Sequence, residues 1–175
     1  RKAIAATAVC WAGFGTVTWL VHHNRTVLID RAGLMFWRSG ADNAPIGSPA
    51  LLEALCDMTA LGGTLVLTLM VIGASVALLF LKLRREAVLM VITALTGTAA
   101  ATTAKLLVGR PRPEIVPHLT YAGGNSFPSG HSFNSAMVYV AIALAFATLS
   151  ARESVRLTII AAALALSALI AVSRV

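Results

Sequence analysis

The sequence predicts an all-α integral membrane protein, and composition is the first reason. Of the 175 residues, 58% are hydrophobic and only 12% are charged, and the mean hydropathy is +0.82. An ordinary soluble domain is about 25% charged and about 45–50% apolar. This composition therefore excludes a disordered chain and most soluble enzymes. The net charge of +7 does not indicate a nucleic-acid partner, because the basic residues lie at the ends of apolar stretches instead of in one dense run.

Five long apolar stretches are the second reason. A membrane-spanning helix needs about 20 mostly apolar residues. The predicted spans are residues 3–21, 58–81, 87–105, 130–150 and 156–173. Buried helices of a soluble bundle are the alternative, but such helices carry a polar face and these stretches have none. The first stretch is longer than the apolar part of a signal peptide, so we interpret it as a span.

The basic residues predict an orientation for these spans. Residues 82–86, between the second and third spans, hold the densest basic cluster, and cytoplasmic loops favour Lys and Arg. We place this loop in the cytoplasm, and alternation then places residues 1–2 and 152–156 on the same side. The total number of basic residues is equal on the two sides, so the prediction depends on the outer ones having another role.

The long outer loop, residues 22–57, is predicted to contain a short helix that lies in the membrane interface. Ser48 is a suitable N-cap, and Pro49 suits the first helical position. Its apolar face would consist of Leu51, Leu52 and Leu55. Phe36 and Trp37 would anchor the loop beside it. This helix is either a surface anchor or a wall for a lipid substrate.

Neither a disulfide nor a metal site is predicted. Cys10 lies midway through the first span and Cys56 lies at the outer interface, so about 10 Å or more of depth separates them. The Cys and His residues do not have metal-ligand spacing. We therefore expect no metal and no cofactor.

Candidate chemistry begins where the third span ends. Thr93, Gly97 and Ala101 precede Lys105 at four-residue spacing, and such small-residue stripes pack against neighbouring helices. Lys105 is therefore expected to point into the bundle, and a lysine that extends to the interface is the alternative. Arg112 follows in a loop that its two flanking prolines stiffen, which suits bidentate binding of phosphate.

A second group of candidates opens the fourth span, at Pro128-Ser129-Gly130-His131. With Ser126 as the expected cap, the backbone amides of residues 129–131 would form an anion site at a positive helix end. Gly130 would let an anion approach the backbone closely, and His131 can exchange a proton near neutral pH. A plain helix cap with an interfacial histidine is the alternative.

Arg174 ends the fifth span on the same outer side, after Ala163, Ser167 and Ala171 on one face. Three cations, on Lys105, Arg112 and Arg174, and one helix N-terminus are thus expected to converge. A multiply charged anion suits that positive field, and a lipid phosphate could enter from the bilayer. We assign Arg110 no role beyond local charge.

These residues resemble the type-2 phosphatidic acid phosphatase superfamily over residues 57–175. Its first signature, Lys, six residues and Arg-Pro, matches Lys105 and Arg112-Pro113, and its second, Pro-Ser-Gly-His, matches residues 128–131. Its third, Ser-Arg, five residues, His, three residues and Asp, begins at Ser173-Arg174. The His and Asp would lie beyond residue 175, so we expect a longer protein and an inactive fragment. The first residue is not Met, which agrees with a trimmed N-terminus.

The resemblance implies a six-helix membrane bundle, of which five spans are present here, and hydrolysis of a lipid phosphate through a phosphohistidine without a metal. In that mechanism His131 is the acid. The phosphate clamp consists of Lys105, Arg112, Ser129, Gly130 and Arg174.

The expected partners are a lipid phosphate and the bilayer, without nucleic acid or an obligate protein partner. The small size and short loops favour a bacterial enzyme in the cytoplasmic membrane, and the predicted orientation of the spans places its site on the extracytoplasmic side. Undecaprenyl pyrophosphate, phosphatidylglycerophosphate, phosphatidate and diacylglycerol pyrophosphate all remain open as substrates. The alternative function is a non-catalytic protein that binds or transports an anionic lipid, and a His and an Asp at the expected positions would favour the enzyme.

Overall fold

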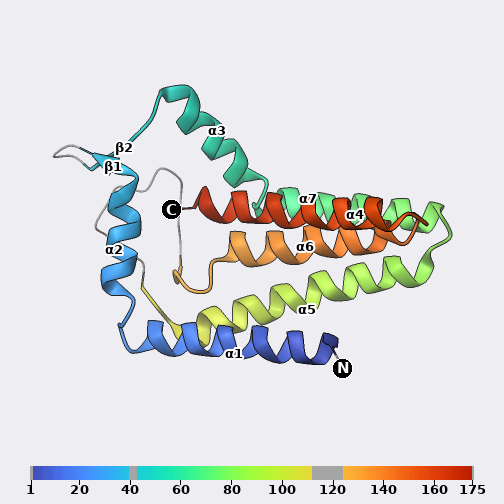
Figure 1. Cartoon of the computed structure of the whole chain (residues 1–175), viewed down its shortest axis with the longest axis horizontal. Helices are drawn as coiled ribbons and strands as arrows, with labels where there is room; N and C mark the ends of the chain where they lie inside the picture. The colour runs from blue at the N-terminus through green and yellow to red at the C-terminus, as the bar shows by residue number, and fades with distance from the viewer. Residues whose placement is uncertain (1, 40–42, 112–123, 175) are drawn as a thin grey trace. The chain divides into compact units, whose positions relative to one another are not determined.

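The computed structural model describes residues 2–39, 43–111 and 124–174, and it is mostly helical (Figure 1). Its helices are α1 (Lys2–His22), α2 (Val27–Phe36), α3 (Pro49–Ala60), α4 (Thr64–Phe80), α5 (Arg84–Val108), α6 (Gly130–Ala147) and α7 (Glu153–Val172). One small hairpin joins β1 (Arg38–Ser39) to β2 (Ala44–Pro45), with Arg38 opposite Pro45.

The prediction of membrane-spanning helices is confirmed for the second half of the chain. Among the described residues, α5, α6 and α7 are each long and apolar enough to cross a bilayer. The bent pair α3 and α4 would make a fourth span if it counts as one crossing, and Ala8–His22 of α1 is a shorter apolar helix. The predicted number of five spans thus stays a prediction.

The second predicted span, residues 58–81, is wrong in one respect because it is not one helix. α3 ends at Ala60, α4 begins at Thr64, and the two are bent by 52°. The cause is the Gly62-Gly63 pair, since paired glycines favour a turn over a continuing helix. Gly63 has the extended backbone of an N-cap, with φ −70° and ψ 149°. We call residues 59–63 the α3–α4 break.

The helix predicted after Ser48 is present as α3, and its place in the membrane interface stays a prediction. The Ser48 side chain accepts a hydrogen bond from the Leu51 backbone N–H at 3.3 Å, and Pro49 occupies the first turn. The rest of the outer loop, however, contains more structure than predicted. α2 and the hairpin both lie within residues 22–57, which were expected to contain only one helix.

The described chain falls into two compact units. The first comprises residues 2–39, 43–46, 105–111 and 124–127, and the second comprises residues 47–104 and 128–174. In the second unit, α6 packs against both α4 and α7 (Figure 1).

Two hydrophobic clusters fix which helix ends lie together in the second unit. One cluster joins Leu67 of α4, Val138 and Tyr139 of α6, and Ile170 near the end of α7. The other joins Leu78 of α4 and the start of α5 to Phe146 near the end of α6. The α4–α5 and α6–α7 turns therefore share one end of this unit. The start of α6 and the end of α7 share the other.

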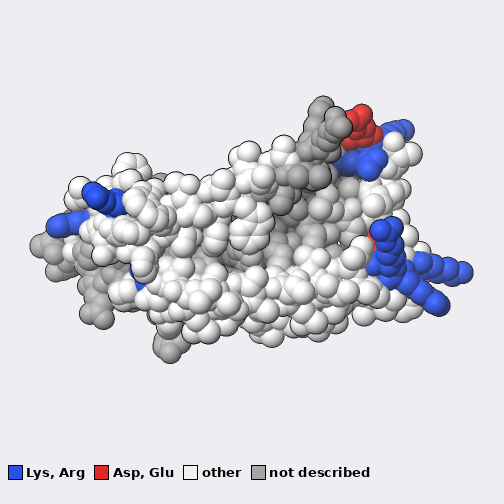
Figure 2. Space-filling view, turned by 90° about the horizontal axis from the view of Figure 1, so that it is seen from below, with Lys and Arg blue, Asp and Glu red and all other residues white. Residues whose placement is uncertain are grey.

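The outward faces of these helices are apolar, as expected for helices in contact with lipid. Leu65 and Phe80 of α4 are 73% and 84% exposed, and Leu95 of α5 is 66% exposed. Figure 2 shows a largely uncharged surface on which the Lys and Arg side chains gather in separate groups. So much exposed apolar area is unusual for a soluble monomer. The protein is therefore an all-α membrane bundle.

Candidate active site

The start of α6 is held by Ser129, which is the N-cap of the helix. The Ser129 hydroxyl oxygen accepts hydrogen bonds from the Ser132 backbone N–H at 3.4 Å and from the Ser132 hydroxyl at 3.0 Å. Gly130 is the first helical residue and His131 the second. The expectation that Ser126 is the cap is therefore wrong. The Ser126 hydroxyl instead lies against the carbonyl oxygens of Arg110 and Pro111, at 3.2 and 3.0 Å.

This helix start has the chemistry of an anion site. Backbone amides in the first turn of a helix have no acceptor within the helix, and the helix dipole makes that end positive. Ser129 accepts both of its observed hydrogen bonds, so its own proton is available to an acceptor outside the helix. Gly130 has no side chain to keep an anion from these amides.

His131 lies against the α3–α4 break. A β-carbon on Gly62 would be 3.3 Å from Cβ and 3.4 Å from Cδ2 of His131. Gly62 is itself buried. The imidazole of His131 is therefore packed closely against the backbone of the break.

Arg174 lies two residues beyond the last residue of α7. Its backbone N–H donates to the carbonyl of Ala171 at 3.3 Å. The preceding residue, Ser173, is bonded to Thr59 of α3, whose hydroxyl lies 2.8 Å from the Ser173 hydroxyl. The end of α7 is thus tied to the end of α3.

The α3–α4 break therefore contacts two of the predicted motifs, because Thr59 bonds Ser173 and Gly62 packs on His131. The structure places Ser129, Gly130, His131 and Arg174 at one end of the second unit.

Lys105 belongs to the first unit and lies in the last turns of α5, where it is half-buried. Its carbonyl oxygen accepts a hydrogen bond from the Asn125 side-chain amide at 2.7 Å. The small-residue stripe before it does face a neighbouring helix, since a β-carbon on Gly97 would lie 1.8 Å from the Met137 sulfur of α6. Ala101 is 4% exposed, but Thr93 is exposed and lies outside this contact.

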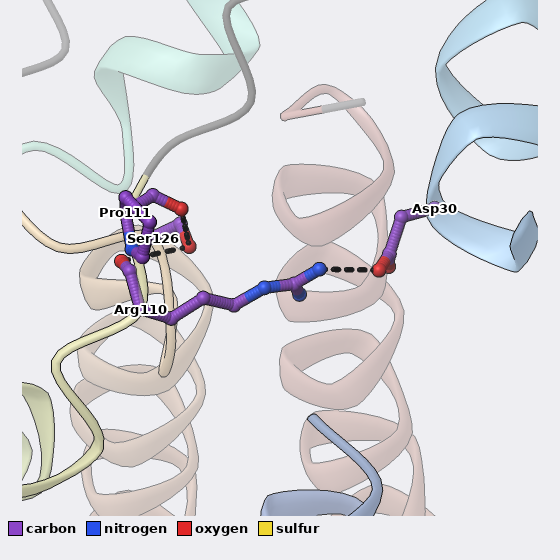
Figure 3. Close-up of polar contacts among 4 residues, drawn as sticks. All are labelled: Asp30, Arg110, Pro111 and Ser126. Carbon is purple, nitrogen blue, oxygen red and sulfur yellow. Dashed lines mark hydrogen bonds and ion pairs between the residues drawn. The ribbon is translucent and has the colours of Figure 1, made fainter. Parts of the chain in front are cut away.

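The segment after α5 is anchored to α2 by an ion pair that the sequence did not reveal (Figure 3). Arg110 Nη2 lies 2.5 Å from Asp30 Oδ2, with the two side chains 19% and 33% exposed. Arg110 thus uses its charge within the protein, to pair with Asp30. The Ser126 bonds join the same segment to the chain just before α6. Arg112 and Pro113 lie outside the described residues.

Sequence signals existed for only some of these features. The Gly62-Gly63 pair could have revealed the break, and serine before glycine at residues 129–130 could have revealed the cap. Asp30 and Arg110 are 80 positions apart, and no local pattern connects them. In the described residues no three His, Cys, Asp or Glu side chains gather in a metal-binding group.

The model of the PAP2 superfamily matches residues 85–175. Phosphatidylglycerophosphatase B of Bacillus subtilis (strain 168) is 32% identical over 98 residues, which are 56% of this chain and 48% of that protein. The chain thus spans about half the length of this curated relative.

A solved structure of a transmembrane protein has a similar fold. The crystal structure of a transmembrane PAP2-type phosphatidylglycerolphosphate phosphatase from Bacillus subtilis superposes with a TM-score of 0.81 at 24% identity. The match covers 95% of this chain and 80% of that one. The helical arrangement described above is therefore shared with a solved membrane protein.

Proposed function

This chain belongs to the PAP2 superfamily, and we propose that the protein is a membrane lipid phosphatase that hydrolyses a phosphomonoester or a pyrophosphate on a lipid. The observation that carries the proposal is the capped start of α6, with His131 in its first turn, at the same end of the unit as Arg174. The name of the Bacillus relative makes phosphatidylglycerophosphate the first substrate to test. Undecaprenyl pyrophosphate, one of the substrates that the sequence leaves open, is the second.

The phosphate would be held by charge and by backbone amides. Arg174 and the start of α6, with Ser129 and Gly130, would bind its oxygens from the second unit. Lys105 and Arg112 would complete the clamp. Positioning and charge stabilisation dominate the catalysis of phosphoryl transfer, which suits a site of this composition.

In the proposed reaction a histidine beyond residue 175 attacks phosphorus while the bond from phosphorus to the lipid oxygen breaks. His131 gives its proton to that departing oxygen, so the lipid leaves as an alcohol or as a shorter phosphate. Water then hydrolyses the phosphohistidine and releases inorganic phosphate. No step in this scheme uses a metal.

We also propose that the site faces away from the cytoplasm of a bacterial cell. The turns at the opposite end of the second unit, together with the first helical turns that follow them, carry five basic residues: Lys82, Arg84, Arg85, Arg152 and Arg156. Cytoplasmic loops are enriched in such residues. In this proposal α1 and the bent α3–α4 pair each cross the membrane, which gives five spans within residues 1–175.

Phosphate release from lipid micelles by the full-length protein tests the proposal. We expect release from phosphatidylglycerophosphate, and loss of more than about 10²-fold in Arg174→Ala, as for removal of one transition-state stabiliser. Arg156→Ala, at the opposite end of the second unit, is the matched control and should keep its activity. Lipid binding without any phosphate release would refute the enzyme and favour the non-catalytic alternative.

A further inference from the structure

The α3–α4 break contacts both the start of α6 and the end of α7. We propose that Thr59 and Gly62 in this break are positioning residues that fix His131 relative to Arg174 during catalysis. The inference rests on the proposed phosphatase function, in which His131 is the acid and Arg174 binds the phosphate. The spacing between these two residues matters only if the protein carries out that reaction. Neither residue belongs to the three signature motifs.

Thr59 bonds the backbone and the side chain of Ser173. The Ser173 hydroxyl donates to the carbonyl of Ile170 at 2.9 Å, which uses its only proton. The Thr59 hydroxyl therefore donates, and its proton faces the Ser173 carbonyl at 3.1 Å and the Ser173 hydroxyl oxygen at 2.8 Å. Thr59 is only 7% exposed, so water competes little for this bond. The residue before Arg174 is thus fixed to α3.

Gly62 makes the second contact, by close approach. A β-carbon there would lie 2.7 Å from Cγ2 of Ile170, closer than real β-carbons approach, and 3.3 Å from Cβ of His131. Any larger residue would have to push α6 and α7 away from the break. The absence of a side chain at residue 62 is therefore what lets the two helix ends lie close to one backbone segment.

A third contact keeps the break itself in place. The Tyr139 hydroxyl of α6 donates to the carbonyl of Leu61 at 2.9 Å. Leu61 stands at the end of α3, where helix carbonyls lose their usual partners. The break is therefore bonded to α6 on one side and to α7 on the other. Its bonds on these two sides link the position of α6 to that of the end of α7.

Precise spacing has a large effect on catalysis. A misplacement of about 1 Å, even one caused far from the reacting atoms, can lower a rate by about 10²-fold. Relieving the contact at Gly62 requires a shift of about that size, because ordinary contacts between carbon atoms begin near about 3.5 Å. The break thus gives two perturbations, one steric and one polar, that do not alter any residue of the proposed clamp.

Gly62→Ala in the full-length protein is the steric test, and Gly73→Ala is its matched control. Gly73 lies in α4 with open space around its backbone, so alanine should have no effect on activity there. We expect Gly62→Ala to lower kcat for a lipid phosphate by about 10–10²-fold, with a smaller change in KM. The loss should be smaller for p-nitrophenyl phosphate, whose leaving group needs no proton from His131.

Thr59→Val is the polar test, because valine keeps the shape of threonine but cannot donate. Thr59→Ser restores the hydroxyl and should restore kcat. Thr68→Val is the control, because the Thr68 hydroxyl is exposed and donates to the Thr64 carbonyl of its own helix. This series remains informative if Gly62→Ala does not fold. The folding of each variant is checked by size-exclusion chromatography and thermal unfolding in detergent.

The outcomes separate this inference from the proposed function. If the wild-type protein releases no phosphate from any lipid, both are overturned. If the wild type is active and Gly62→Ala and Thr59→Val match their controls, only the positioning role is refuted. Equal losses on the lipid and on p-nitrophenyl phosphate, with no recovery in Thr59→Ser, would also refute it, because they indicate general damage. Selective loss of kcat on the lipid, with recovery in Thr59→Ser, supports it.

Discussion

The ion pair between Asp30 and Arg110 gives a prediction whose size follows from its geometry. Exposed ion pairs contribute about 0.2–1 kcal/mol, whereas breaking a buried pair costs about 3–5 kcal/mol. Here Nη2 and Oδ2 are 2.5 Å apart, and the Arg110 and Asp30 side chains are 19% and 33% exposed. The pair is therefore partly shielded from water. We expect a coupling free energy of about 1 kcal/mol, at the upper end of the range for exposed pairs.

A double-mutant cycle measures this coupling directly. Asp30→Asn, Arg110→Gln and the double variant are compared with the wild type, and the free energy of unfolding in mixed micelles is measured by denaturant titration. The control cycle pairs Asp30→Asn with Arg31→Gln, because Arg31 is the adjacent cation and the structure does not pair it with Asp30. That cycle should give a coupling near zero.

Two results would contradict this reasoning. A coupling for Asp30 and Arg110 no larger than that of the control cycle would show that α2 does not anchor the segment after α5. A coupling that persists unchanged at about 1 M salt would also be inconsistent, because partly exposed charges are screened at that ionic strength.

Three further predictions concern topology, the clamp and helix packing. In a cysteine-free background, Gly123→Cys should react with an impermeant thiol reagent in intact cells, and Lys82→Cys only after lysis; the reverse pattern would invert the orientation. Arg112→Lys should lose the bidentate fork and most phosphate release, so wild-type kinetics in this variant would exclude Arg112 from the clamp. Gly97→Leu should destabilise the bundle by about 1–3 kcal/mol through overpacking, and more than Gly97→Ala, where the flexible Met137 side chain can move. Equal unfolding midpoints for those two variants would argue against the contact between α5 and α6.

The sequence was sufficient for the features that depend on local composition. Apolar runs separated by charges predicted α5, α6 and α7 within a few residues, because lipid requires a continuous apolar surface on each spanning helix. The start of α3 was also predicted, since Ser48 and Pro49 act within one helical turn. These signals are read correctly without any knowledge of the tertiary structure.

Features that the hydropathy pattern does not encode were missed or misplaced. The predicted second span is divided between α3, which ends at Ala60, and α4, which begins at Thr64, because two glycines lie between them. Hydropathy alone cannot distinguish such a bent helix pair from a straight helix. Ser126 and Ser129 are both reasonable caps from the sequence. The choice between them depends on where the chain after α5 lies, since Ser126 contacts Arg110 and Pro111.

The measurement that tests the central claim most directly is the leaving-group dependence of His131→Ala in the full-length protein. A general acid contributes about 10²–10⁴-fold, so phosphate release from phosphatidylglycerophosphate should fall by roughly that factor. Release from p-nitrophenyl phosphate should fall much less, because its leaving group departs without a proton. An equal loss on both substrates, or no loss on either, would contradict the assignment of His131 as the acid of a lipid phosphatase.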